Sequence, residues 1–358
     1  MDMEELILAE MKALAESVKP EWPILHQNKW LARSGLQKAI RRGRAEQAWA
    51  CGDILFADDK AYAWKALATV IVEDVGFGDP DLLSYAALST LSTITNKMPS
   101  PKRLFMAMIG RACESYKTRS ACELSLGTEK DPDMDWPAFR RLSIEDLSSV
   151  MFSDAEPPTL YAATSVMRAR CRAAKNGALL NVTLELIMDE IDDPQLKRAA
   201  MLNFERNVDS MNLSIWPLVS RKLYAGVFVE ADKMPPEIEI GGLSSATFDM
   251  HTQDGKRAIK AFHTSLTKKG VPEFVALAKL DGPTIIRALG SLIFILEGGQ
   301  LDRRIMSAHL QALKNYQDRN FALAWGVPPE LYGPLLQLMA ENFDVLNEKR
   351  KWSHGVAG

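Results

Sequence analysis

ALATVIVEDVGFGDPDLL, the segment from Ala66 to Leu83, decides the fold of this chain. Its first half carries apolar residues at the spacing of one helical face, namely Leu67, Val70 and Ile71. Gly76 and Gly78 can end that helix, and Asp79 followed by Pro80 is typical of the N-cap and first position of a new helix. The sequence therefore predicts two helices that meet at a fixed corner.

Two acidic residues, Glu73 and Asp74, fall in the last turn of the first predicted helix. The helix dipole is negative there, so these carboxylates need a cationic partner. The nearest cationic cluster in the sequence consists of Lys38, Arg41, Arg42 and Arg44. We expect an ion-pair network between the two helices. The corner could instead bind a partner protein, and the three arginines could contact phosphates.

Three motifs around this corner carry a resemblance to a known family. They read SGLQKAIRRG from Ser34 to Gly43, VEDVGFGDP from Val72 to Pro80, and SPKR from Ser100 to Arg103. Together they resemble the helical C-terminal region of the replication-associated recombination ATPases, which are relatives of the clamp loaders. In that family a KSIRG helix precedes a helix end that reads AxEDIGLADP. The resemblance covers roughly residues 30 to 125, about a third of the chain.

In that family this region forms a collar that holds the ATPase subunits in a ring. The resemblance therefore implies an assembly role, with partners that are proteins of a replication or repair complex or further copies of this chain. The ATPase itself is missing, because no GxxxxGK[ST] motif occurs and the single Gly-Lys pair, Gly255-Lys256, lacks the surrounding residues. No catalytic role and no cofactor carries over. Such a protein would suit the replication apparatus of a phage or mobile element.

Composition places the chain among ordinary soluble proteins. Its 358 residues are 47% hydrophobic and 25% charged, which suits two or three domains. A net charge of −3 argues against a dedicated DNA-binding protein, so we expect at most weak DNA contact through a local basic face. The four cysteines form no CxxC pair, which predicts buried thiols in a reducing cytoplasm, the host's for a phage protein. No apolar run is long enough to span a membrane.

Hydrophobic periodicity is helical along most of the chain, so we predict an all-α, multi-helix protein. A collar-like N-terminal domain would be followed by further helical bundle domains. Polar, proline-bearing stretches at residues 127–136 and 234–242 mark the boundaries. The predicted parts are an N-terminal amphipathic helix and turn (1–29), the collar-like domain (30–130), a middle domain (137–231) and a C-terminal domain (247–358). Leu223 to Val229 has the composition of a strand.

The middle domain carries a group of basic residues on one predicted helix, Thr159 to Lys175, namely Arg168, Arg170, Arg172 and Lys175. Their spacing of two spreads them around the helix, so they form no continuous stripe for DNA. Arg168, Arg172 and Lys175 remain candidates for an anion or DNA contact. Two more helices are predicted there, at 178–191 and 194–208. The C-terminal domain is predicted to have helices at 271–280, 283–297, 301–317 and 328–351, with 285–296 the central buried one.

One cluster, from Phe248 to Ala258, has a composition that could support chemistry. Asp249, His251 and Asp254 are close enough in sequence to bind a metal, and Lys256 and Arg257 at a helix start could face an anion. Alternatively, Asp254 is the N-cap of that helix and His251 completes the turn. The pattern leaves open a capped loop, an anion or partner site, and a catalytic site.

No nucleophile with a paired base and no specific metal-ligand spacing occurs in the sequence. We therefore expect a non-enzymatic assembly or accessory protein of DNA replication or repair that organises partner subunits. The alternative is an enzyme, or a nucleotide- or anion-binding protein, that uses His251, Asp254, Lys256 and Arg257. Convergence of these four side chains in one pocket would favour the alternative.

Overall fold

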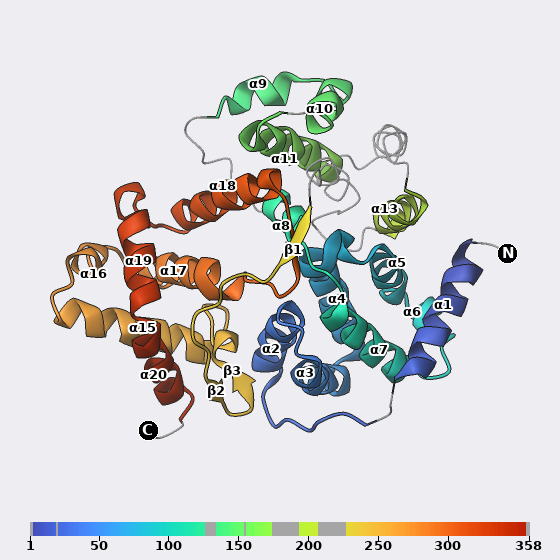
Figure 1. Ribbon diagram of the computed structural model, residues 1–358, viewed down its shortest axis with the longest axis horizontal. Coiled ribbons are helices and arrows are strands. Elements are labelled where there is room, and N and C mark those ends of the chain that lie inside the picture. Colours follow the sequence, from blue (N-terminus) through green and yellow to red (C-terminus); the bar gives the residue numbers. More distant parts are fainter. Residues whose placement is uncertain are drawn as a thin grey trace. The chain divides into compact units, whose positions relative to one another are not determined.

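The computed structural model describes residues 3–18, 21–125, 134–153, 155–173, 193–206 and 227–355 (Figure 1). These residues are predominantly helical with a few short strands, which confirms the predicted all-α class. The predicted helix at 178–191 and most of the predicted boundary at 127–136 lie outside the described residues.

The chain divides into two compact units. Unit 1 comprises Met1–Pro20, Lys60–Ala231 and Arg303–Gln317. Unit 2 comprises Glu21–Asp59, Asp232–Asp302 and Asp318–Gly358. Each unit is therefore assembled from separated segments, whereas the sequence predicts contiguous domains.

Unit 1 is a set of packed helices with one small sheet. Its helices are α1 (Met3–Ser17), α4 (Lys60–Val70), η1 (Ile71–Val75), η2 (Gly76–Gly78), α5 (Pro80–Ser89), α6 (Ser92–Thr95), α7 (Pro101–Glu114), α8 (Ser120–Ser125), α9 (Trp136–Arg141), α10 (Ile144–Met151), α11 (Pro157–Ala173), α13 (Pro194–Arg206) and the first part of α18 (Ala308–Ala324). The amphipathic α1 buries Ile7 and Met11 and packs along α7, while α13 packs along α5.

The predicted corner forms as the sequence indicates. After α4 the chain makes one wider helical turn, η1, and Gly76 then adopts a φ of +52°, which favours glycine. Asp79 caps α5 by accepting a hydrogen bond from the Leu82 backbone N–H at 3.0 Å, with Pro80 at the first helical position. A Cβ at Gly78 would lie 1.9 Å from the Tyr116 carbonyl oxygen, so the corner and the end of α7 fix each other.

The sheet of unit 1 lies where one predicted strand and one predicted helix were expected. Strand β1 (Phe228–Glu230) pairs antiparallel with β4 (Arg304–Met306), with Val229 opposite Ile305. The prediction of a helix from residue 301 was therefore wrong, because α18 begins at Ala308. Arg304 and Met306 are buried on either side of Ile305, the alternation of a strand. A three-residue strand is too short for this alternation to be recognised in the sequence beside the helical pattern that follows it.

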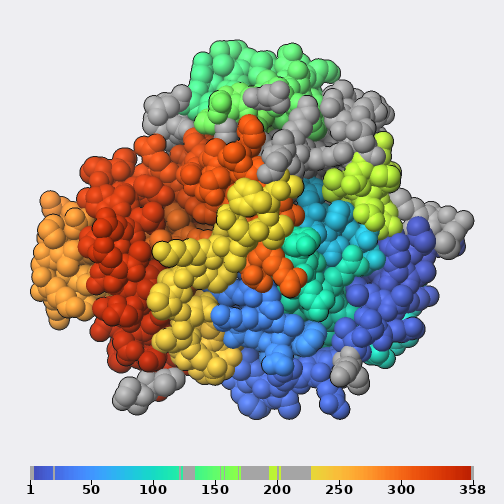
Figure 2. All heavy atoms as spheres, in the orientation of Figure 1, coloured from blue at the N-terminus to red at the C-terminus, as the bar shows by residue number. Residues whose placement is uncertain are grey.

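Unit 2 has the following elements: α2 (Lys29–Arg41), α3 (Ala45–Asp58), β2 (Glu239–Ile240), β3 (Leu243–Ser244), η3 (Ser245–Thr247), α15 (Gln253–Lys268), α16 (Pro272–Leu277), α17 (Gly282–Ile293), η4 (Phe294–Gly298), the second part of α18, η5 (Pro329–Leu331), α19 (Tyr332–Glu341) and α20 (Phe343–Ser353). Figure 2 shows the yellow β2–β3 hairpin beside the blue α2 and α3, with the red C-terminal helices on its other side. Segments far apart in sequence thus build one unit.

The core of unit 2 surrounds α17, as predicted for residues 285–296. Leu289, Leu292 and Ile293 are buried there against α15, α16, α19 and α20. The predicted single helix at 328–351 was wrong, because it is divided at Asn342 into α19 and α20. The Asn342 side chain donates a hydrogen bond to the Leu338 carbonyl oxygen at 2.8 Å and so completes the end of α19. None of the described helices is both long and apolar enough to cross a membrane.

Candidate functional site

The predicted cluster at residues 248–258 separates into several local contacts. Asp249 is buried and pairs with Lys38 of α2, and it accepts hydrogen bonds from the His251 backbone N–H at 2.9 Å and from Ser34 Oγ at 3.3 Å. Burial alone would raise the pKa of Asp249, but the Lys38 charge holds it below its ordinary value. Asp249 is therefore a structural anchor between α2 and the start of α15.

Thr252, and not Asp254 as predicted, is the N-cap of α15. Its Oγ1 accepts a hydrogen bond from the Gly255 backbone N–H at 3.0 Å. A Cβ at Gly255 would lie 1.9 Å from the Asp249 carbonyl oxygen, so this tight turn requires glycine. Asp254 follows in the first turn, where it binds His354 Nδ1 at 3.0 Å and lies 3.6 Å from the Arg257 guanidinium.

The four residues of the enzyme alternative do not converge on one point, although Asp254 and Arg257 form an ion pair of 3.6 Å on the first turns of α15. The His251 ring faces Trp325 at 6.4 Å, Asp254 faces His354, and Lys256 is exposed. Arg257 lines a groove described below that the other three do not line. Among the described residues, no group of three metal-ligating side chains could hold an ion. The arrangement therefore gives the catalytic interpretation no support.

The cations predicted to pair with the corner are largely buried. Arg42 pairs with Glu237 and donates to the Glu297 carbonyl oxygen at 2.9 Å, and Arg41 donates to the Gly298 carbonyl oxygen. In unit 1 the fully buried Asp74 pairs with Arg119 at 3.3 Å, a partner that the sequence did not suggest. The predicted pairing of Glu73 and Asp74 with the α2 arginines would join residues of two units, and it stays a prediction.

A second buried ion pair was missed altogether. Glu297 and Arg350 are both 0% exposed and form two charge-assisted hydrogen bonds of 2.6 and 3.1 Å. Arg350 also donates to Asn347 Oδ1 at 2.9 Å and to the Phe248 carbonyl oxygen at 3.2 Å. The one signal in the sequence is Glu297, an acid at the end of an otherwise apolar helix. A buried carboxylate needs a cation as its partner.

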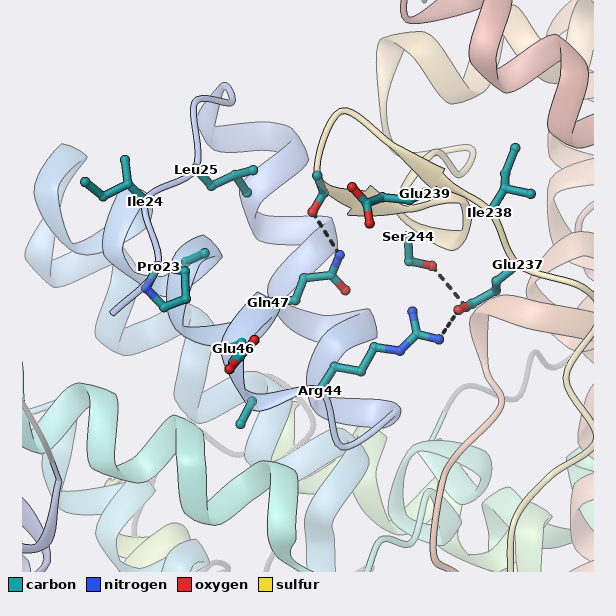
Figure 3. A pocket seen from close by; sticks show the side chains of 13 residues that line it. Pro23, Ile24, Leu25, Arg44, Glu46, Gln47, Glu237, Ile238, Glu239 and Ser244 are labelled. Atoms are coloured by element: carbon teal, nitrogen blue, oxygen red, sulfur yellow. Dashed lines mark hydrogen bonds and ion pairs between the residues drawn. The ribbon is translucent and has the colours of Figure 1, made fainter. Parts of the chain in front are cut away.

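Arg44, a candidate for phosphate contact, lines a pocket of about 660 Å³ between the 23–25 loop, the start of α3 and the β2–β3 hairpin (Figure 3). Its guanidinium pairs with Glu237, which also accepts a hydrogen bond from Ser244 Oγ at 3.0 Å. Two further acids, Glu46 and Glu239, line the same pocket. The pocket therefore does not attract anions, and Arg44 acts within the protein.

A groove of about 540 Å³ between α15 and α20 has the opposite character. Its lining from α15 follows one stripe at spacings of three and four residues, namely Arg257, Lys260, Ala261, Thr264, Ser265 and Lys268. Lys349 and Trp352, three residues apart, line it from α20. The apolar residues of α15 on the other side, including Ile259 and Phe262, are buried in the core. Burial of that side turns the cationic stripe outward.

The charges of this groove are available to a ligand. None of the described residues that line it is acidic. Lys260, Lys268 and Lys349 form no ion pair among the described residues, and the Arg257 side chain is 65% exposed beside Asp254. The nearby Glu348 is paired with Lys351 at 3.0 Å. Four cations around one groove can bind several phosphates of a polyanion.

The remaining candidates lie beyond what the structure describes. The side chains of Arg168 and Arg172 on α11, and the whole of Lys175, are outside the described residues, so their predicted contacts stay predictions. Arg170 on the same helix donates to the Arg140 carbonyl oxygen at 2.7 Å. Cys51, Cys113 and Cys122 are buried thiols outside any disulfide, and burial raises the pKa of each to about 12.

The sequence identified only one of the residues that characterise this groove, Arg257. It did not identify Lys260, Lys268, Lys349 or Trp352. A helical plot of 257–268 would have found the stripe, although not its partner helix. No protein-family model, no curated protein and no solved structure matches this chain.

Proposed function

We propose that this protein is a non-enzymatic accessory protein of DNA replication or repair that holds nucleic acid by its phosphates in the α15–α20 groove. The observation that supports the proposal is the set of four cations, Arg257, Lys260, Lys268 and Lys349, around a groove with no acidic lining residue. The assignment to replication or repair rests on the resemblance carried by residues 30 to 125.

Electrostatics sets the expected strength of this contact. The whole chain carries a net charge of −3, so attraction comes from the groove and not from the molecule as a whole. Each neutralised phosphate of a single strand contributes about −0.7 to the slope of log affinity against log salt. Four contacts therefore give a slope of about −3. Binding is weak and salt-sensitive.

The assembly role needs a surface other than the one expected from the sequence. The apolar faces of the N-terminal helix and of the helix around Met106 were candidates for a contact with partners. In unit 1 these helices are α1 and α7, which pack along each other, and Ile7, Met11 and Met106 are fully buried. Partner proteins must therefore bind elsewhere. Light scattering at tens of micromolar tests self-association, and a monodisperse monomer would contradict that part of the proposal.

The groove is tested by reversing its three unpaired lysines, with Lys260→Glu, Lys268→Glu and Lys349→Glu in one variant. A matched control carries Lys12→Glu, Lys65→Glu and Lys279→Glu, three exposed lysines that form no ion pair among the described residues. Both variants change the net charge equally. Fluorescence anisotropy of a labelled 20-nucleotide strand at low salt measures binding.

We expect the groove variant to lose binding at least tenfold and its salt slope to fall by about two, since three of four phosphate contacts are removed. The control should bind within about threefold of the wild type because none of its three lysines lines the groove. Equal losses in the two variants, or no binding by the wild type, would overturn the proposal.

A further inference from the structure

We infer that the groove binds single-stranded nucleic acid in preference to duplex, with one unpaired base stacked on Trp352. This inference rests on the proposed function and names the class of nucleic acid that the same site takes. It depends on the place of one aromatic side chain among the groove cations.

Trp352 lies on the surface. The residue is 65% exposed, and among the described residues it makes no ring or cation contact. An indole is a large apolar surface, and leaving it in water forgoes the stabilisation that its burial in a core would give. Its position in a groove lined by four cations places an aromatic face beside sites for phosphates. Base stacking beside backbone contacts is how proteins hold single strands without reading sequence.

The backbone on either side of Trp352 is anchored. Two residues before it, Arg350 is fixed by the buried Glu297 carboxylate. Two residues after it, the His354 ring is bonded to Asp254 at the start of α15. The backbone that carries the indole is therefore fixed beside the α15 stripe. Backbone that is ordered before binding does not have to be ordered when a base stacks on the side chain, which limits the entropy cost of binding.

The length of the cationic stripe suits a short strand. Arg257 and Lys268 are eleven residues apart on α15, which at 1.5 Å per residue is about 16 Å. This span is enough for a few nucleotides of an extended strand, with Lys349 and Trp352 on the facing helix. The hydroxyls of Thr264 and Ser265 also line this path.

A duplex cannot use this platform. Each base inside a duplex is stacked on both faces, so no base face is free for Trp352. A duplex would contact only the cations and would therefore bind more weakly. An unpaired base of any type offers a face, so little sequence preference is expected. The groove contacts carry no selection for the 2′-hydroxyl, so single-stranded DNA and RNA should both bind.

The test replaces Trp352 and compares three probes: labelled 20-nucleotide oligothymidylate, the matching oligouridylate, and a 20-base-pair DNA duplex. Trp352→Ala removes the platform, and Trp352→Phe keeps an aromatic ring. The matched control is Trp30→Ala, because Trp30 is 63% exposed in the same unit but does not line the groove. Thermal unfolding of each variant checks that the fold is retained.

We expect Trp352→Ala to weaken single-strand binding roughly 5- to 150-fold, which is the effect of losing one stacked base. Its duplex affinity and its salt slope should stay unchanged, because both depend on the cations. Trp352→Phe should restore most of the loss, and Trp30→Ala should have no effect. The wild type should bind both single strands more tightly than the duplex.

Two outcomes separate this inference from the function on which it rests. If Trp352→Ala binds single strands like the wild type while the lysine variant does not, stacking is wrong and the phosphate groove survives. A wild type that prefers duplex leads to the same conclusion. If the wild type binds none of the three probes, the proposed function fails and the inference fails with it.

Discussion

Unit 2 contains two sets of cations that differ in their surroundings. Lys38, Arg42 and Arg350 are buried, and each is paired with a carboxylate, from Asp249, Glu237 and Glu297 respectively. The groove lysines 260, 268 and 349 have no such partner among the described residues. The same chemical groups therefore serve the fold in one place and are free for a ligand in the other.

Desolvation explains the difference. A charge taken out of water must gain a partner or it destabilises the fold, so every buried cation in this set is matched. A charge that stays in water has no such requirement, and an unpaired one keeps its attraction for an external anion. By local charge density alone, the Arg41–Arg44 stretch would be a better anion site than the groove. Solvent exposure of the cations makes the groove the better site.

The largest effect is expected from breaking the Glu297–Arg350 pair. Glu297→Gln leaves the Arg350 guanidinium buried without its counterion, so the free energy of unfolding should fall by about 3–5 kcal/mol. Urea denaturation followed by circular dichroism measures it. The control is Glu348→Gln, whose exposed pair with Lys351 should contribute less than about 1 kcal/mol. A loss for Glu297→Gln no larger than the control's would mean that burial does not set the two classes apart.

A second, smaller effect is expected at Lys38, and it depends on pH. Lys38→Met strands the buried Asp249 carboxylate and should lower the free energy of unfolding by about 2–4 kcal/mol at pH 7. In the wild type the pKa of Asp249 is below its ordinary value, so its stabilisation is full above that ordinary value and is lost as the pH falls through the lowered pKa.

Without Lys38, burial raises the pKa of Asp249 instead, and protonation then relieves the stranded charge. The stability deficit of Lys38→Met should therefore shrink between pH 7 and pH 4. Asp249→Asn in the same background should remove this pH dependence. A deficit that is constant over this range would show that Asp249 is not the group left unpaired.

The smallest effect on stability is expected from the groove. Reversing Lys260, Lys268 and Lys349 to glutamate removes no ion pair among the described residues, so the free energy of unfolding should change by less than about 1 kcal/mol. Differential scanning calorimetry of this variant and its lysine control measures it. A loss near that of Glu297→Gln would place these lysines with the structural set and leave the groove without a free charge.

The sequence by itself determined the features that depend on neighbouring residues. The corner at residues 66–83 is set by Gly76, Asp79 and Pro80, whose backbone preferences act within one turn. The buried course of α17 follows from a run that is apolar on nearly every side. The helical class follows in the same way, because a period of 3.6 residues is a local property.

The local sequence did not determine the N-cap of α15, because two residues can fill that position. Thr252 and Asp254 are both good N-caps, and in the structure Thr252 is the cap, in a turn where the Asp249 backbone lies against Gly255. Strand β4 similarly depends on pairing with β1, which lies more than seventy residues earlier. Without that partner, residues 304–306 carry no signal that distinguishes them from a helix.

Tertiary structure alone decided which charges are paired and which line the groove. Glu297 meets Arg350 across 53 positions, and the α15 stripe meets Trp352 across more than eighty. Residue types and spacings do not encode such distances, because they are fixed by how whole helices pack. Packing also sets the solvent exposure of each cation. A buried cation must be paired with a carboxylate inside the fold, whereas an exposed one can bind a ligand.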